Sequence, residues 1–296
     1  MDKIDLFIIG AQKTGSTSIF NYLKKHENVI SHEQRELTFF LNDFEYENRN
    51  LLEEKYLPEL KNKSKDMIVL GKSVMNMYSL KTIERLHQNN PEMKLIVIVR
   101  NPIKRAYSYY WYARRRGWEE IQTFEEALKI EDSRIEQYGW DQARNNCYKF
   151  NGLYAKHLTD IFKIFPREQV LIFTDDDLKN KPKDILSNVF GLFNLKSIDV
   201  DTNKHYNKSK IAKSEGLARL VAKFFASQSI LKKLIRSMLP HQIAVRLRHA
   251  ILSVNEKDFT PPLMNSSTKQ ELIDFFKEDI YDLEKIINKN LEDWLK

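Results

Sequence analysis

The sequence contains a single cysteine, Cys147, so no disulfide can form within the chain. Glycine and proline are also scarce, with 8 of each in 296 residues, and no segment is dominated by a few residue types. Such a composition argues against intrinsic disorder and against a repeat array. The hydrophobic fraction of 42% is enough to form a sizeable core.

Long apolar runs and metal-ligand clusters are missing as well. No stretch approaches the ~18 consecutive apolar residues of a membrane-spanning helix, and the apolar run at residues 6–9 is too short for a signal peptide. The 7 histidines are scattered without the spacing of metal ligands. We therefore expect a cytoplasmic protein with no integral membrane segment and no bound metal.

Basic residues outnumber acidic ones. The formal net charge is +7, and residues 204–250 contain 11 Lys or Arg against one acidic residue, Glu215. A positive balance suits an anionic ligand such as a nucleotide, a sulfated glycan, a nucleic acid or a membrane surface. The basic segment is typical of a solvated helical face, and it also fits a positive wall near a polyanionic ligand.

Short apolar runs alternate with segments of helical periodicity. The runs at residues 5–10, 67–71, 94–100 and 168–174 are nearly continuous in hydrophobicity, which is typical of parallel strands covered on both faces. Helical patterns lie among these runs, at residues 17–25, 79–88, 101–115 and 152–165. The alternation predicts an α/β fold with an open parallel sheet flanked by helices.

The last third of the chain is predicted to be helical, over residues 183–193, 215–252 and 267–295. The basic amphipathic pattern of residues 215–252 favours a helix packed on the sheet, or a lid, over peripheral membrane binding. No change in composition marks a boundary. We expect one domain over residues 1–296, with a helical lid or extension at about 215–296.

A strand-to-helix turn near the N-terminus has the features of an anion-binding loop. The sequence IIGAQKTGST, residues 8–17, leads from an apolar strand through a glycine-containing turn into a helix. Backbone N–H groups and the positive end of the helix dipole would face a bound anion there. The residues of this candidate loop are Gly10, Gln12, Lys13, Thr14, Gly15, Ser16 and Thr17.

The loop is P-loop-like but lacks the triphosphate signature. The spacing from Gly10 to Gly15 matches the first half of a P-loop, whereas position 16 is Ser16 and the lysine stands inside the loop at Lys13. No aspartate of the Walker B kind ends the strand at residues 94–99, which leads into Arg100.

A second anion-binding element follows that strand. Arg100 stands at its carboxyl end, which is the edge where α/β sheets bind ligands, and Ser108 lies eight residues further on in a predicted helix. The arginine fork can hold a phosphate through two hydrogen bonds, and the serine can add a hydroxyl donor.

Together these segments resemble sulfotransferases that use 3′-phosphoadenosine-5′-phosphosulfate (PAPS). Residues 10–17 resemble the family's 5′-phosphosulfate loop. The segment IVRNPIKRAYSY, residues 98–109, resembles its 3′-phosphate motif, with Arg100 and Ser108 in the binding positions. The heparan-sulfate and bacterial carbohydrate branch is closer still, because RELTFF at residues 35–40 and the GKS of residues 71–73 resemble two of its blocks. The middle segments GLYAKHL and FPREQVL also resemble this branch.

The resemblance extends to a loop that closes over the nucleotide in bacterial relatives. It is matched here by Tyr206 and Lys208 and, further on, by Lys213 and Ser214. At Lys213 the relatives often carry arginine. The single cysteine also excludes the disulfide-held nucleotide loop of the Golgi type.

The resemblance implies roles for four residues. Glu36 would be the general base that takes the proton of the attacking acceptor, with His32 as its rival. Lys13 would stabilise the leaving 5′-phosphate, and Lys72 would hold the sulfuryl group or the leaving oxygen. PAPS would be the co-substrate, and no metal would be required. The acceptor would be a hydroxyl or amine of a glycan or of a small secondary metabolite.

Two other classes of function remain open from the residues themselves. A P-loop kinase or nucleotidase would share the fold and would need magnesium and ATP. A basic protein that binds nucleic acid or membranes without catalysis would rest on residues 204–250. The anion loop together with Arg100 and Ser108 disfavours the second class, because a simple charge patch needs neither. We expect no nucleic-acid partner.

Overall fold

The computed structural model describes residues 3–202, 210–226 and 254–296. The chain divides into two compact units. The first comprises Met1–Arg105, Leu153–Asn207 and Ile273–Lys296, and the second comprises Ala106–Gly152 and Lys208–Leu272. The division does not test whether the units fold separately, so a single domain stays a prediction.

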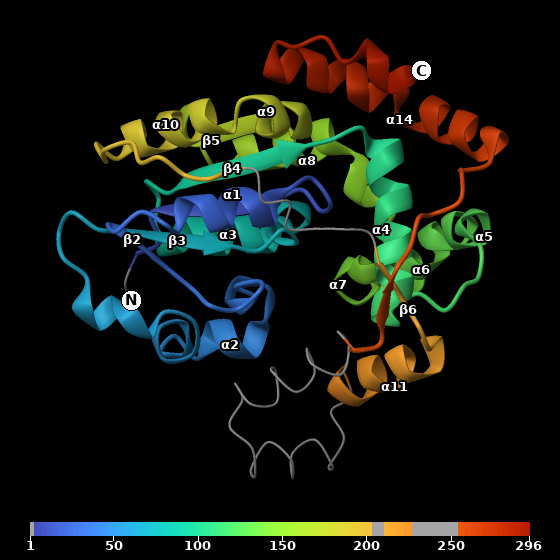
Figure 1. Cartoon of the computed structure of the whole chain (residues 1–296), viewed down its shortest axis with the longest axis horizontal. Coiled ribbons are helices and arrows are strands. Elements are labelled where there is room, and N and C mark those ends of the chain that lie inside the picture. The colour runs from blue at the N-terminus through green and yellow to red at the C-terminus, as the bar shows by residue number, and fades with distance from the viewer. Residues whose placement is uncertain (1–2, 203–209, 227–253) are drawn as a thin grey trace. The chain divides into compact units, whose positions relative to one another are not determined.

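The first unit contains a five-stranded parallel sheet in the order β2-β3-β1-β4-β5 (Figure 1). Four strands confirm the apolar runs of the sequence: β1 (Leu6–Gly10), β3 (Ile68–Lys72), β4 (Lys94–Val99) and β5 (Val170–Thr174). The edge strand β2 (Val29–Ser31) was missed, because three residues are too few for a periodic signal. The predicted α/β class with an open parallel sheet is confirmed.

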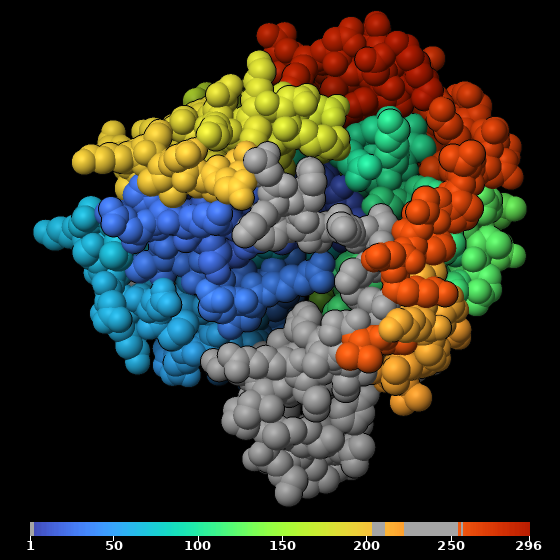
Figure 2. Space-filling view, viewed as in Figure 1, coloured from blue at the N-terminus to red at the C-terminus, as the bar shows by residue number. Residues whose placement is uncertain are grey.

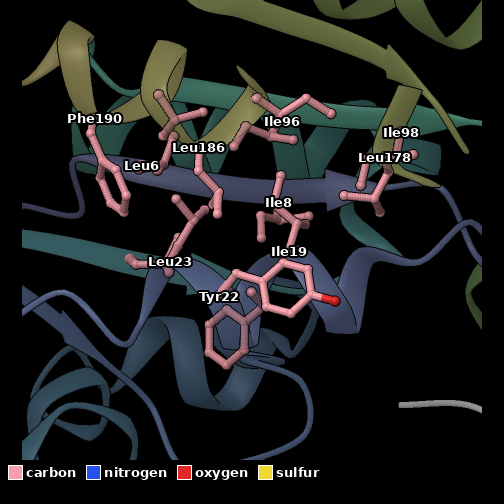
Figure 3. Close-up of a cluster of buried hydrophobic side chains, with 14 of the residues drawn as sticks. Leu6, Ile8, Ile19, Tyr22, Leu23, Ile96, Ile98, Leu178, Leu186 and Phe190 are labelled. Atoms are coloured by element: carbon pink, nitrogen blue, oxygen red, sulfur yellow. The ribbon is translucent and has the colours of Figure 1, made fainter. Parts of the chain in front are cut away.

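One face of the sheet is covered by α1 (Ser16–Leu23), α9 (Asp175–Asn180) and α10 (Pro182–Leu192). Side chains alternate along a strand, so β1 turns Leu6 and Ile8 toward these helices. There they meet Leu23 and Leu186 in a continuous buried cluster (Figure 3). In the space-filling view α10 packs directly against α1 (Figure 2).

The opposite face of the sheet packs against α3 (Leu80–Asn89) and α8 (Tyr154–Phe162), which lie behind it in Figure 1. Phe7 of β1 points to this side and meets the Phe40 ring edge-on, with centroids 5.7 Å apart. Gly71 permits that contact, because a Cβ at this position would come within 2.5 Å of the Phe7 ring. Burial on both faces accounts for the continuous hydrophobicity of the strands.

A short helix and a long one also contribute to the described part of the first unit. The short helix α2 (Asp43–Glu47) follows the segment that carries Glu36. The long helix α14 (Ser266–Ile287) begins in the second unit and continues into the first, where Asp279 accepts hydrogen bonds from the amides of Ala155 and Lys156 at the start of α8. Near the C-terminus, the Trp294 carbonyl accepts a hydrogen bond of 3.0 Å from the Asn101 side chain.

The second unit is mainly helical. The helix α4 (Pro102–Arg116) crosses from the first unit into it. Its described residues also form α5 (Phe124–Lys129), α6 (Glu131–Tyr138), α7 (Trp140–Ala143) and α11 (Glu215–Ala226). Buried Glu131 accepts hydrogen bonds from three consecutive amides, those of Tyr148, Lys149 and Phe150.

Three helices in the described part of the C-terminal third, α10, α11 and α14, confirm that part of the prediction. A short antiparallel pair, β6 (Lys210–Ala212) with β7 (Glu256–Asp258), was not expected. The remainder of the predicted basic helix, residues 227–252, lies outside the described residues. In the part of the chain that is described, no helix is both long and apolar enough to cross a membrane.

Candidate active site

The anion loop connects the end of β1 to the start of α1. Two of its residues, Lys13 with φ 62° and Gly15 with φ 95°, adopt the left-handed backbone conformation that favours glycine. At Gly15 a side chain would also collide with Leu178, because a Cβ there would lie 2.8 Å from its Cδ2. The backbone conformation therefore favours glycine at this position, and any side chain there would require Leu178 to shift.

The loop is tied down at both ends. The Ala11 amide donates to the Ile98 carbonyl of β4 at 2.8 Å, and the Thr14 hydroxyl donates to the Ala11 carbonyl at 2.8 Å. Ser16 and Thr17 open α1, and the first amides of a helix have no intrahelical acceptor. Their N–H groups and the positive end of the helix dipole are the donors that an anion would meet at this turn.

Gln12 has a different position from its neighbours. Its amide donates to the Tyr78 hydroxyl at 3.2 Å, and its side-chain nitrogen lies 2.5 Å from the Met75 sulfur. With 4% of the residue exposed, Gln12 fastens the loop to the segment after β3. These contacts favour a role in holding the loop over direct contact with a phosphate.

Lys72 and Glu36 form an ion pair at the carboxyl end of β3. The Lys72 Nζ lies 2.6 Å from Glu36 Oε1, and the Val74 amide donates to Glu36 Oε2 at 3.0 Å. The Lys72 side chain is 1% exposed, whereas that of Glu36 is 25% exposed. The lysine is thus buried beneath a carboxylate that remains open to solvent.

This pair lies beside the anion loop. Lys72 is aligned with Ile8 of β1, and the Ser73 amide donates to the Ile8 carbonyl at 3.0 Å. Ile8 is two residues before Gly10, where the loop begins. The adjacent parallel strands β1 and β3 therefore bring the pair and the loop to the same edge of the sheet.

His32 is buried behind Lys72 rather than at the surface. Its Nε2 accepts a hydrogen bond of 3.0 Å from the Lys72 amide, so its Nδ1 carries the proton and donates to the Gln34 carbonyl at 2.8 Å. Burial, followed by the nearby Lys72 charge, lowers the pKa of His32 to about 3. A neutral ring with both nitrogens engaged fixes the backbone around Lys72.

Arg100 contacts both the anion loop and a carboxylate. Its Nη1 donates to the Lys13 carbonyl at 3.0 Å, and its Nε lies 3.5 Å from Asp175 Oδ2. Asp175, the first residue of α9, also binds the Lys179 ammonium at 2.9 Å. The Arg100 side chain is 31% exposed, which leaves it accessible to a ligand.

The other residues predicted to bind the nucleotide belong to the second unit or lie outside the described residues. Ser108 is half-buried on α4. Ser214 precedes α11, where its hydroxyl accepts from the Leu217 amide at 3.3 Å, and Lys213 Nζ donates to the Val254 carbonyl at 3.0 Å. Tyr206 and Lys208 lie outside the described residues.

Two contributors to the site were missed from the sequence. Asp175 stands in a run of acidic residues at the start of a helix, a pattern that indicates only a helix N-terminus. Phe20 on α1 places its ring centroid 5.7 Å from Lys72 Nζ, and apolar spacing alone marks it as a core residue. Among the described residues, no cluster of His, Cys, Asp and Glu could hold a metal ion.

The open parallel sheet and the glycine-containing turn at its carboxyl edge define an α/β protein with a candidate anion site. The family model described as "Sulfotransferase domain" matches residues 3–243, which is most of the chain. The chain belongs to this sulfotransferase family, as the motifs at residues 10–17 and 98–109 predicted.

Relatives of known activity include enzymes of heparan sulfate. The chain is 29% identical over 207 residues to human heparan sulfate glucosamine 3-O-sulfotransferase 5, an alignment that covers 69% of this chain and 57% of that protein. It is 26% identical over 212 residues to the bifunctional heparan sulfate N-deacetylase/N-sulfotransferase 1 of Caenorhabditis briggsae, covering 70% of this chain and 24% of that protein. The chain therefore matches between a quarter and somewhat over half of these relatives' length.

A solved structure shares the whole fold. The sulfotransferase from Alicyclobacillus acidocaldarius superposes with a TM-score of 0.66 at 20% identity, and the match covers 100% of both chains. At this identity the likeness establishes the fold alone.

Proposed function

We propose that this protein transfers a sulfuryl group from PAPS to a hydroxyl or amine of a glycan or of a small molecule. The observation that carries the proposal is the buried Lys72 paired with the accessible Glu36 carboxylate, on the strand next to the anion loop. This combination supplies a base and a cation at one edge of the sheet, next to preorganised anion donors.

The donor groups on this edge fit a nucleotide with two anionic ends. Amides at the start of α1 and the Lys13 ammonium suit a phosphosulfate, and the Arg100 fork suits a second phosphate. Bound PAPS supplies the sulfuryl group, attached to its 5′-phosphate. Lys13 and Lys72 then stabilise the negative charge that gathers on the leaving phosphate oxygen, so lysines provide the charge that magnesium brings to kinases.

We assign the base to Glu36. A carboxylate oxygen has two lone pairs, so Oε1 and Oε2 can each accept a further hydrogen bond beyond those from Lys72 and Val74. As the acceptor oxygen or nitrogen attacks sulfur, its proton moves to Glu36. His32 is disfavoured, because its Nε2 already accepts from the Lys72 amide and its pKa of about 3 makes it a weak base.

The proposal also concerns the chemical class of the acceptor, which is either a glycan or a small metabolite. Two of the relatives are named for sulfation of glucosamine or of a nitrogen in heparan sulfate, which supports a glycan hydroxyl or amine. A small secondary metabolite is the alternative acceptor. Incubating the protein with labelled PAPS and panels of both compound classes distinguishes them by which product carries the label. A cytoplasmic location is part of the same proposal.

A thermal-shift comparison tests the class of donor. We expect adenosine 3′,5′-bisphosphate to raise the melting temperature in the presence of EDTA, and ATP with Mg²⁺ to have a much smaller effect. Stabilisation by ATP and Mg²⁺ alone would instead support the kinase alternative. Salt-sensitive binding to polyanions, without nucleotide binding or turnover, would support the non-catalytic alternative.

A further inference from the structure

Arg100 makes a contact within the protein that binding a phosphate would not by itself require. Its Nη1 donates a hydrogen bond of 3.0 Å to the Lys13 carbonyl, which belongs to the anion loop 87 residues earlier in the chain. The Arg100 Nη2 has no hydrogen-bond partner in the described part of the chain. One guanidinium therefore binds the loop with one nitrogen and keeps another available for a ligand.

This hydrogen bond fixes the orientation of a peptide group. The peptide between Lys13 and Thr14 is trans and planar, so its C=O and N–H point in opposite directions. Holding the Lys13 carbonyl toward Arg100 points the Thr14 N–H away from Arg100. Lys13 has φ 62°, a conformation that costs a lysine free energy and that the surroundings must maintain.

Asp175 holds the guanidinium in turn. Its carboxylate lies 3.5 Å from Arg100 Nε and is 11% exposed. The start of α9 is fixed by a capping box in which the Thr174 hydroxyl accepts from the Asp177 amide and the Asp177 carboxylate accepts from the Thr174 amide. Lys289 Nζ binds the same Asp177 at 2.5 Å. This capped helix start places Asp175 beside Arg100.

We propose that Arg100, oriented by Asp175, couples the two phosphate subsites by holding the Lys13–Thr14 peptide in its anion-binding orientation. Asp175 is a positioning residue in this arrangement, since it acts through Arg100. This inference rests on the proposed function. It adds that Arg100 contributes to binding of the 5′-phosphate group even when the ligand has no 3′-phosphate.

Two nucleotides separate this role from simple phosphate binding. Adenosine 5′-monophosphate has no 3′-phosphate, so a residue that contacts only the 3′-phosphate cannot affect its affinity. We expect Arg100→Lys, which keeps the charge but loses the planar fork, to weaken calorimetric binding of adenosine 5′-monophosphate at least about fivefold. Binding of adenosine 3′,5′-bisphosphate should weaken more. An Arg100→Lys protein that binds the monophosphate as the wild type does would overturn the coupling.

Replacing Asp175 is a test in which electrostatics and positioning predict opposite changes in the affinity for a phosphate ligand. Removing a carboxylate near an anion site should by charge alone strengthen phosphate binding. Positioning predicts that Asp175→Ala weakens binding of adenosine 5′-monophosphate about threefold. Asp175→Asn should restore most of the loss, because its amide oxygen can still face Arg100 Nε and attract the guanidinium.

Asp176→Ala is the matched control. Asp176 is the next residue of α9, its side chain is 64% exposed, and it shares the Lys179 ammonium at 2.9 Å without contacting Arg100. We expect this variant to bind the monophosphate as well as the wild type or slightly better. Equal affinities for Asp175→Ala and Asp176→Ala would overturn the role of Asp175. Failure of the wild type to bind the bisphosphate would overturn the proposed function, and this inference with it.

Discussion

The burial of a neutral His32 makes a quantitative prediction about acid stability. The pKa of this ring falls from 6.5 to about 3 on folding, chiefly through burial and then through the Lys72 charge. Between these two values the unfolded chain binds a proton that the folded chain does not. Stability therefore increases with pH across this window, is complete above about pH 6.5, and is lost as the pH falls toward 3.

The size of the effect follows from proton linkage. Each pH unit within the window corresponds to about 1.4 kcal/mol, and His32 is only partly protonated in the unfolded chain between pH 7 and 6.5. Integration from pH 7 to pH 5 gives a loss of about 2 kcal/mol in the free energy of unfolding from this one residue. Other groups add their own pH dependence, so a comparison with a variant is required.

His32→Gln removes the titration, while its side-chain oxygen can still accept from the Lys72 amide. Urea denaturation of both proteins at pH 7 and pH 5 gives the four free energies needed. We expect the wild type to lose about 2 kcal/mol more than the variant between these pH values. The reasoning is refuted if both proteins lose the same amount, because His32 would then be protonated or accessible in the folded state.

Three further predictions concern the active site. Glu36→Gln should lower kcat by roughly 10²–10⁴-fold and change the affinity for adenosine 3′,5′-bisphosphate less than twofold. Glu33→Gln, at a side chain that is 83% exposed, should leave both quantities unchanged. A fully active Glu36→Gln enzyme would remove Glu36 from the mechanism. Lys13→Ala should lower kcat by about 10²–10³-fold without lowering the melting temperature, measured by steady-state assays with labelled PAPS. Turnover at the wild-type rate would contradict its role. Gly15→Ala should weaken nucleotide binding and lower the free energy of unfolding by about 1–3 kcal/mol, because φ is 95° and a Cβ would crowd Leu178. A free energy of unfolding in urea equal to that of the wild type would contradict the turn geometry.

The candidate site combines the buried Lys72 ammonium with the partly exposed Glu36 carboxylate. The Lys72 backbone belongs to β3, and its ammonium lies between the Glu36 carboxylate and the Phe20 ring, so its charge has little freedom to move. Preorganised charge of this kind needs no reorganisation as the transition state forms. Removing Glu36 leaves that lysine as a buried charge without its partner, so the glutamine substitution, which retains an oxygen acceptor, is the informative one.

Local patterns in the sequence predicted much of this protein. Four of the five parallel strands followed from short continuous apolar runs, because burial on both faces leaves no polar alternation. The turn between β1 and α1 followed from Gly10 and Gly15 between a strand and a helix, since glycine permits the backbone conformations of such a turn. Its role as an anion site stays a prediction. These features depend on neighbours within a few residues, and the sequence records them directly.

The tertiary structure alone decided which distant residues meet. Lys72 and Glu36 are 36 positions apart, and Arg100 reaches a carbonyl 87 positions away. Their contacts depend on the strand order β3-β1-β4, in which β1 lies between strands that follow it in the chain. Hydrophobic periodicity shows that a segment is a buried strand and says nothing about its neighbours in the sheet. The burial of His32 and the contacts of Arg100 with Asp175 and the Lys13 carbonyl were therefore decided only by the tertiary structure.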